Sequence, residues 1–143
     1  MQRDCSAILA SMLKVVVKRS SAGLGLFTTA PIARGEKVIE YTGEVVSSDE
    51  ADLRGGRYLF ELNDKWTIDG KGRKNIARYI NHSCKPNCYP ELTEDEKRVF
   101  IFSKRKIKPG EELTYNYGKD YFKQILKPAG CRCHHCTTIR LQK

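Results

Sequence analysis

The sequence predicts a mostly β domain, because its apolar runs are short, frequent and separated by turn-forming residues. Helical patterns are few and brief, and the chain contains no internal repeat or low-complexity segment. Its 143 residues are one domain in length, which is enough for a hydrophobic core without disulfide staples.

Seven runs are expected to be strands, and Gly, Pro, Asn or Asp residues separate them. They cover residues 14–18, 25–28, 37–46, 58–62, 66–69, 99–103 and 112–117. Short helical segments are expected at 5–13, 48–53, 75–80 and 121–126. The second of these has a serine cap and acidic residues in its first turn. A hinge is expected at 127–130.

The positive charge is concentrated at one end of the chain. Residues 1–96 hold 14 Lys and Arg against 14 Asp and Glu, whereas residues 97–143 hold 12 against 3, which accounts for the net charge of +9. A basic patch of this kind is typical of a surface for nucleic acid or another acidic partner. The alternative is a solvated face with no partner.

The expected environment is intracellular and reducing. Six cysteines are too few for a disulfide scaffold, and their spacing resembles metal ligation. Residues 1–18 do not form a signal peptide, because an acidic residue stands where positive charge belongs and polar residues interrupt the apolar run. No stretch approaches the length of a transmembrane helix, so we expect a soluble protein without membrane contact.

Three closely spaced cysteines near the C-terminus predict a metal site. Cys131, Cys133 and Cys136 lack one ligand for tetrahedral Zn²⁺. Either Cys84 or Cys88 can supply it, and the metal would then tie the tail to a polar segment in the middle of the chain.

Two further segments carry chemically informative residues. Residues 22–27 read AGLGLF, and glycines one residue apart let the backbone approach a ligand closely, although a plain turn is the favoured explanation for the motif alone. Tyr41 precedes Thr-Gly at the end of an expected strand, where it is either a core residue or part of a site. Neither segment is specific alone, since the first lacks the strand–GxGxxG–helix context of a dinucleotide fold.

The sequences RYINHSCKPNC (78–88) and EELTYNY (111–117) are more specific. In the first, four consecutive polar side chains are framed by aliphatic residues, which packing does not explain. His82 can act there as a base, or its ring can be held by its neighbours. In the second, Tyr115 and Tyr117 share one face of an extended strand and form an aromatic wall with polar tips.

In this order, and followed by a Cys-rich tail, these motifs resemble the SET domain of protein lysine methyltransferases from about Lys14 to Cys136. The resemblance implies a β-clip of small curved sheets, in which the NHSC and EELTYNY segments form a pseudoknot. It divides the chain into an N-terminal extension (1–13), a SET domain (14–118) and a post-SET zinc-binding tail (119–143).

The resemblance also implies roles for individual residues. S-adenosylmethionine would be held by the backbone of Ala22, Gly23 and Leu24, by Tyr58, Asn81 and His82, and by Arg132 over the adenine. Tyr41, Tyr115 and Tyr117 would line the channel of the substrate lysine. One Zn²⁺ would be bound by Cys84, Cys131, Cys133 and Cys136, which leaves Cys88 as a small buried residue.

Two departures from the family pattern affect these expectations. The tail reads CxCxxC, whereas the usual post-SET spacing leaves four residues before the last cysteine, so His134 or His135 can substitute as a ligand. The segment between residues 46 and 58 is short, and no pre-SET zinc cluster is present. The residues that form the substrate groove are therefore not predicted by the resemblance.

The expected function is transfer of one or two methyl groups to a lysine, with a histone tail as the favoured substrate. A Tyr at position 115 resembles family members that favour low methylation states. Acidic residues Glu44, Asp49, Glu50, Asp52 and 91–96 are expected to form a groove for a basic tail, and residues 97–143 to contact nucleosomal DNA.

Three alternatives remain: a non-histone target such as a ribosomal or bacterial protein, a non-catalytic zinc-stapled binding module, and, least favoured, a redox role for the cysteines. The expected location is the nucleus for a eukaryotic or host-directed protein, and otherwise the bacterial cytoplasm. The chain is either a stand-alone enzyme or an excised domain.

Overall fold

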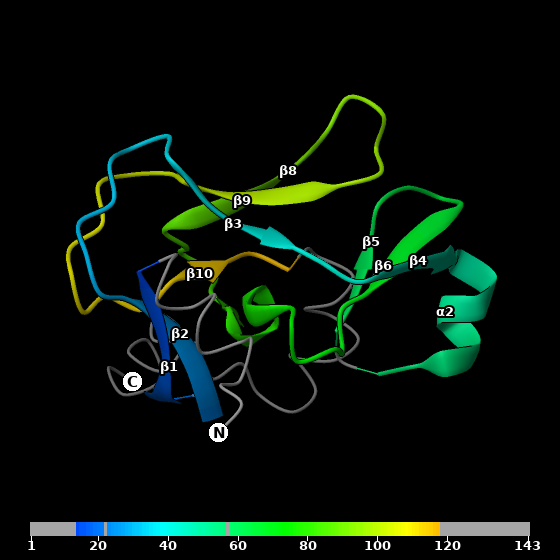
Figure 1. The fold of residues 1–143 in the computed structure, drawn as a ribbon, viewed down its shortest axis with the longest axis horizontal. Helices are drawn as coiled ribbons and strands as arrows, with labels where there is room; N and C mark the ends of the chain where they lie inside the picture. The colour runs from blue at the N-terminus through cyan, green and yellow to red at the C-terminus, as the bar shows by residue number, and fades with distance from the viewer. Residues whose placement is uncertain (1–13, 22, 57, 118–143) are drawn as a thin grey trace, which may run out of the picture.

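The computed structural model describes residues 14–21, 23–56 and 58–117, and these fold into four small β-sheets with one α-helix and one 3₁₀ helix (Figure 1). The prediction of a mostly β domain is therefore confirmed. No helix within these residues is long and apolar enough to cross a membrane. The helices expected at 5–13 and 121–126 and the hinge at 127–130 lie outside the described residues.

The strands belong to small, separate sheets rather than to one continuous layer. They are β1 (Val15–Ser20), β2 (Gly23–Thr28), β3 (Lys37–Tyr41), β4 (Glu44–Ser47), β5 (Leu59–Glu61), β6 (Trp66–Asp69), β7 (Asn81–His82), β8 (Cys88–Leu92), β9 (Val99–Ser103) and β10 (Thr114–Tyr115). Strands β1 and β2 form an antiparallel hairpin, and two antiparallel sheets have the orders β3-β9-β8 and β4-β6-β5. Strand β7 pairs with β10 in parallel.

The single strand expected at 37–46 is wrong, because the chain changes sheets within it. Strand β3 ends at Tyr41 and β4 begins at Glu44. Between them, a Cβ on Gly43 would collide with the Asp69 carbonyl of β6. The glycine allows this close backbone approach, and the chain then pairs with β6 instead of β9.

Strand β8 was not predicted, because Pro90 stands in its middle. Proline has no N–H to donate to a neighbouring strand, so it argues against a central strand. In the structure β8 is an edge strand, paired only with β9 within the described residues, and the proline is tolerated there. Cys88, its first residue, is fully buried.

The strand expected at 112–117 is extended, but it changes partner along its length. Glu112 forms an antiparallel bridge with Phe27, and the Leu113 amide donates to the Leu26 carbonyl at 2.8 Å. Thr114 and Tyr115 then pair in parallel with β7. One short segment therefore joins the β1–β2 hairpin to the middle of the domain.

Two short helices lie close to expectation. Helix α2 (Ser48–Arg54) begins after Ser47, whose side chain accepts from the Glu50 amide, so Ser47 is the cap. The helix expected at 75–80 is the 3₁₀ helix η1 (Ile76–Tyr79), which contacts β2 and β3. It delivers the chain directly into β7.

The parallel contact between the segments at 81–88 and 112–117 depends on one buried amide. The side chain of Asn87 donates to the Glu112 carbonyl at 2.8 Å and accepts from the Thr114 amide at 2.9 Å. The Ser83 amide adds a bond to the Tyr115 carbonyl at 3.2 Å. These bonds produce the pairing of NHSC with EELTYNY that the resemblance implied, and β10 contacts β8 as well as β7.

Replacing Asn87 with Ala should therefore destabilise the domain strongly. The substitution leaves a backbone carbonyl and a backbone N–H buried without partners, and each costs about 1–3 kcal/mol. Asn87→Asp should also destabilise the domain, because its buried carboxylate can accept from Thr114 but places a charged oxygen against the Glu112 carbonyl. Urea denaturation measures both, and a loss for Asn87→Ala below about 0.5 kcal/mol, the usual effect of a surface substitution, would contradict the assignment.

Candidate active site

The rings of five residues from four segments form a continuous aromatic row. Tyr41 ends β3, Phe60 lies in β5, Tyr115 and Tyr117 lie in and just after β10, and His82 ends β7. Successive ring centroids are 5.4 Å apart from Tyr41 to Phe60, 6.4 Å from Phe60 to Tyr115, 4.8 Å from Tyr115 to Tyr117 and 5.4 Å from Tyr117 to His82. The structure therefore brings together the three tyrosines that were singled out from the sequence.

Tyr41 is held as a neutral phenol at one end of this row. Its ring is buried, and its hydroxyl donates to the Tyr58 carbonyl at 2.8 Å. Burial is the main cause that raises the pKa of Tyr41 well above its ordinary value. A Cβ on Gly70 would collide with the Tyr41 ring and hydroxyl, so the glycine leaves the space that this side chain occupies.

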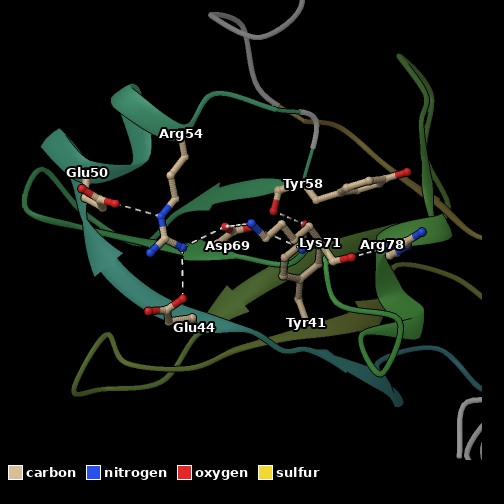
Figure 2. Close-up of polar contacts among 8 residues, drawn as sticks. All are labelled: Tyr41, Glu44, Glu50, Arg54, Tyr58, Asp69, Lys71 and Arg78. Atoms are coloured by element: carbon tan, nitrogen blue, oxygen red, sulfur yellow. Dashed lines mark hydrogen bonds and ion pairs between the residues drawn. The ribbon is translucent and has the colours of Figure 1, made fainter.

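Tyr58 is fixed from two sides, as Figure 2 shows. Its carbonyl accepts from both the Tyr41 hydroxyl and the Gly70 amide, the latter at 2.7 Å. Its ring lies against the guanidinium of Arg78, whose Cζ is 4.7 Å from the ring centroid. Arg78 in turn donates to the Lys71 carbonyl, so Tyr58 is tied to the turn that follows β6.

One guanidinium connects helix α2 to the sheet beneath it (Figure 2). Arg54, at the end of α2, lies 3.0 Å from Glu44 of β4, 3.0 Å from Glu50 and 3.1 Å from Asp69 of β6. The Asp69 side chain is only 5% exposed, and both Arg54 and Lys71, the latter at 3.8 Å, offset the cost of burying it. Sequence reasoning missed this network, although Glu50 and Arg54 have the i, i+4 spacing of a helical ion pair.

Tyr115 and Tyr117 lie on the same side of their segment, as the alternation predicted. Tyr115 is buried, whereas Tyr117 is partly exposed and packs against the core. The Tyr117 hydroxyl donates to the Ile80 carbonyl, just before β7. Its position is therefore fixed by the same inter-segment contact that Asn87 stabilises.

The ring of His82 is held by its neighbours, which favours the second of its two interpretations. Its Nδ1 accepts from the Tyr117 amide at 3.1 Å, and its Nε2 lies 3.4 Å from the Cys84 sulfur. Burial lowers the pKa of His82, which favours the neutral imidazole. With Nδ1 occupied as an acceptor, the ring serves to position the Tyr117 backbone.

Asn81 connects two of the segments predicted to hold a cofactor. Its Nδ2 donates to the Leu24 carbonyl at 2.8 Å, and also contacts Ser20 Oγ at 3.0 Å and Glu112 Oε2 at 2.9 Å. Gly23 begins β2 with a φ of 103°, a conformation that favours glycine. Leu24 and Gly23 are exposed beside Asn81, so the backbone predicted to hold a cofactor and the NHSC motif lie together.

The second glycine of AGLGLF has a different role from the one suggested by the sequence. Gly25 pairs with Lys18 inside the hairpin, and a Cβ there would collide with Glu112 Oε2. The space above Gly25 is therefore filled by a carboxylate of the chain itself and not by a ligand. Only the first glycine has an unusual backbone conformation.

The two described cysteines differ in environment. Cys88 is fully buried, and burial raises the pKa of its thiol to about 12, so it is a poor source of the thiolate that a metal needs. Cys84 is partly exposed. No group of three or more potential ligands gathers within residues 14–21, 23–56 and 58–117. The other predicted site residues, Ala22, Cys131, Arg132, Cys133 and Cys136, lie outside the described residues.

Comparison with known proteins identifies one family. The family described as "SET domain" matches residues 23–118. The chain is 41% identical over 124 residues to "Histone-lysine N-methyltransferase trithorax" of Drosophila virilis, covering 80% of this chain and 3% of that protein. It is 43% identical over 104 residues to "Histone-lysine N-methyltransferase ATXR7" of Arabidopsis thaliana, covering 65% and 7%.

A third relative is a fungal protein. "Histone-lysine N-methyltransferase, H3 lysine-4 specific" of Yarrowia lipolytica is 42% identical over 104 residues, covering 65% of this chain and 9% of that protein. The chain thus spans less than a tenth of the length of each of these relatives.

Proposed function

This chain belongs to the SET-domain family, and from that premise we propose that it is an S-adenosylmethionine-dependent protein-lysine N-methyltransferase that acts on a histone tail. The observation that carries the proposal is the row of Tyr41, Tyr115 and Tyr117 close to the junction of Asn81 with Leu24. The printed names of the three relatives, all histone-lysine N-methyltransferases, support it.

The described residues fit S-adenosylmethionine in chemical terms. Gly23 and Leu24 offer exposed backbone beside Asn81, and among the described residues the side-chain hydrogen bonds of Asn81 run through its Nδ2. The amide oxygen is then suited to accept from the amino-acid part of the cofactor. His82, Tyr58 and, from outside the described residues, Ala22 and Arg132 complete the proposed set. When bound, the cofactor supplies an electrophilic methyl group.

The three tyrosines prepare the lysine amine for attack. The nucleophile must be the neutral amine, and lysine has a reference pKa of about 10.4. Aromatic walls that exclude water disfavour the ammonium form and lower this pKa. Tyr41 remains an uncharged phenol and adds no negative charge that would oppose this effect.

Tyr117 orients the amine. Its hydroxyl donates to the Ile80 carbonyl, and a phenol that donates one hydrogen bond can still accept another through its oxygen. An amine N–H that donates to this oxygen directs its lone pair away from Tyr117, which sets the line of the displacement. No acidic side chain is required at the reaction centre.

The proposed substrate is a basic histone tail, bound by acidic surface residues. Glu44 and Glu50 were expected to contribute, but both are paired with Arg54, which reduces their free charge. The exposed acids of α2, of β8 and of the β8–β9 connection remain: Asp49, Asp52, Glu91, Glu94, Asp95 and Glu96. A non-histone protein with a basic segment is the alternative target.

We assign the zinc to Cys84 with Cys131, Cys133 and Cys136, with His134 or His135 as substitutes for one cysteine. This assignment rests on the partial exposure of Cys84 against the complete burial of Cys88. The proposed location is the nucleus, or the bacterial cytoplasm if the source is bacterial.

Calorimetry and a methylation assay test the proposal together. The protein should release or absorb heat on titration with S-adenosylmethionine, and it should transfer a labelled methyl group to lysine peptides on an array that includes histone tails. Tyr117→Phe should still bind the cofactor but lose most of the rate, because the hydroxyl that contacts the amine is removed. The bond to the Ile80 carbonyl is lost as well, but other hydrogen bonds still hold this segment. A protein without binding heat would instead be a non-catalytic module, and labelling of only non-histone peptides would reject the histone substrate.

Tyr115 is expected to limit the number of methyl groups that are added. In family members a Tyr at this position holds a water beside the amine, and here the buried Tyr115 lies 4.8 Å from Tyr117 between ring centroids. Wild type should give mono- or at most dimethyl-lysine by mass spectrometry, and Tyr115→Phe should shift the product to higher states while remaining active. Mainly trimethyl-lysine from wild type would contradict this.

The exposed loop after β9 is proposed to contact nucleosomal DNA through Lys104, Lys106 and Lys108, whereas Arg105 is paired with Glu111. Changing the three lysines to Glu should reduce methylation of nucleosomes, with the larger loss at low salt, and should leave the rate on free histone unchanged. If wild type and the triple variant methylate nucleosomes at equal rates, the loop does not contact DNA and is only a solvated surface.

Zinc content should distinguish the two described cysteines. Metal analysis should find about one zinc per chain in wild type and in Cys88→Ala, and a clear loss in Cys84→Ser. Chelation should abolish methyl transfer while circular dichroism retains most of the β signal. Zinc that is retained in Cys84→Ser and lost in Cys88→Ala would reverse the assignment.

A further inference from the structure

The carboxylate of Glu112 contacts the side-chain amide of Asn81, which also contacts the β1–β2 hairpin. Glu112 Oε2 lies 2.9 Å from Asn81 Nδ2, and that nitrogen is also 2.8 Å from the Leu24 carbonyl. Ser20 Oγ lies 3.0 Å from the same nitrogen. Gly25 lacks the Cβ that would occupy the position of the Glu112 oxygen.

This arrangement determines which way round the Asn81 amide is. A backbone carbonyl and an ionised carboxylate are acceptors and have no proton to give. If the amide were rotated by half a turn, its oxygen would face both of them, and two hydrogen bonds would become repulsive contacts. Leu24 and Glu112 therefore hold the nitrogen between them, and the Asn81 oxygen is presented on the opposite side.

We propose that Glu112 is a positioning residue for cofactor binding: its carboxylate holds the Asn81 amide in the orientation that presents Oδ1 as an acceptor to the ammonium group of S-adenosylmethionine. The inference rests on the proposed function, and it deepens the role of Asn81 in the same site. Gly25 contributes to this arrangement, because the absence of a side chain there leaves space for the Glu112 carboxylate.

The alternative is that Glu112 only stabilises the hairpin. Its backbone is already held by the bridge to Phe27 and by the Asn87 side chain, so the segment has anchors that do not involve the carboxylate. A purely structural carboxylate would affect stability and both substrates alike. A positioning carboxylate would affect the affinity for S-adenosylmethionine specifically.

The test compares Glu112→Met with Glu112→Gln in the full chain. Methionine keeps the length of the side chain but removes the acceptor, whereas glutamine can still accept through its Oε1. Calorimetry should find S-adenosylmethionine binding about tenfold weaker in Glu112→Met, equivalent to about 1.4 kcal/mol, and within about threefold of wild type in Glu112→Gln. The peptide KM, and kcat at saturating cofactor, should change by less than about twofold in both.

Glu111→Met provides the matched control. Glu111 is the neighbouring carboxylate, but it pairs with Arg105 and accepts from the Lys108 amide, away from Asn81. Its substitution removes the same charge from the same segment, and it should leave the cofactor affinity unchanged. A similar loss in Glu111→Met would attribute the effect to net charge and overturn the proposal.

Gly25→Ala tests the contact between Glu112 and Asn81 without changing either residue. The added methyl group should displace the carboxylate from Asn81 and weaken cofactor binding by a similar factor. Combining it with Glu112→Met should weaken binding no further, since both changes break one contact. If Glu112→Met fails to fold, Gly25→Ala alone tests whether the contact between Glu112 and Asn81 supports cofactor binding.

The readouts separate failure of the inference from failure of the proposed function. If wild type does not bind S-adenosylmethionine, both are overturned. If wild type binds it and Glu112→Met binds it equally well, only the role of Glu112 is overturned. Wild-type NMR should also give a slowly exchanging Asn81 side-chain amide that is lost in Glu112→Met and restored in Glu112→Gln, and an unchanged signal in Glu112→Met would likewise reject the inference.

Discussion

The candidate site depends on the parallel contact between the segments at 81–88 and 112–117. Two pairs of residues form the strands, which is too few to hold the segments together alone. The buried Asn87 side chain supplies further hydrogen bonds to the Glu112 carbonyl and the Thr114 amide, and the Tyr117 hydroxyl and amide supply others to Ile80 and His82. The contact fixes the positions of His82, Tyr115 and Tyr117, and most of the proposed roles in the site belong to these side chains.

The sequence was sufficient for the fold class and for nominating the candidate residues, because both are encoded in local motifs. Tyr115 and Tyr117 follow a two-residue alternation, and NHSC is a compact group of polar side chains. Long-range features were not accessible in the same way. The break after Tyr41 depends on how closely Gly43 approaches the Asp69 carbonyl, and the edge position of β8 depends on which strand lies beside Pro90. Neither relation can be read from neighbouring residues.

The same limit explains the two charged networks. Glu50 and Arg54 are recognisable as a helical pair, but the buried Asp69 lies fifteen residues from Arg54 along the chain. Glu112 and Gly25 are still further apart, so the glycine was attributed to ligand approach when it accommodates a carboxylate. In both cases the sequence does not show which distant residue pairs with the carboxylate: Arg54 with Asp69, and Asn81 with Glu112. For Asp69, burial of the charge is what makes the partner necessary.

The parallel pairing of β7 with β10 has a consequence for folding. Its partners, Asn81 with Thr114 and His82 with Tyr115, are 33 residues apart, and the second strand lies at the C-terminal end of the described residues. Contacts of large sequence separation form slowly, because the intervening chain loses entropy before the contact is gained. During synthesis, the hairpin and both three-stranded sheets can therefore emerge from the ribosome before the proposed binding site is complete. Ligand affinity then reports completion of the whole domain, since no earlier fragment holds all the parts of the site.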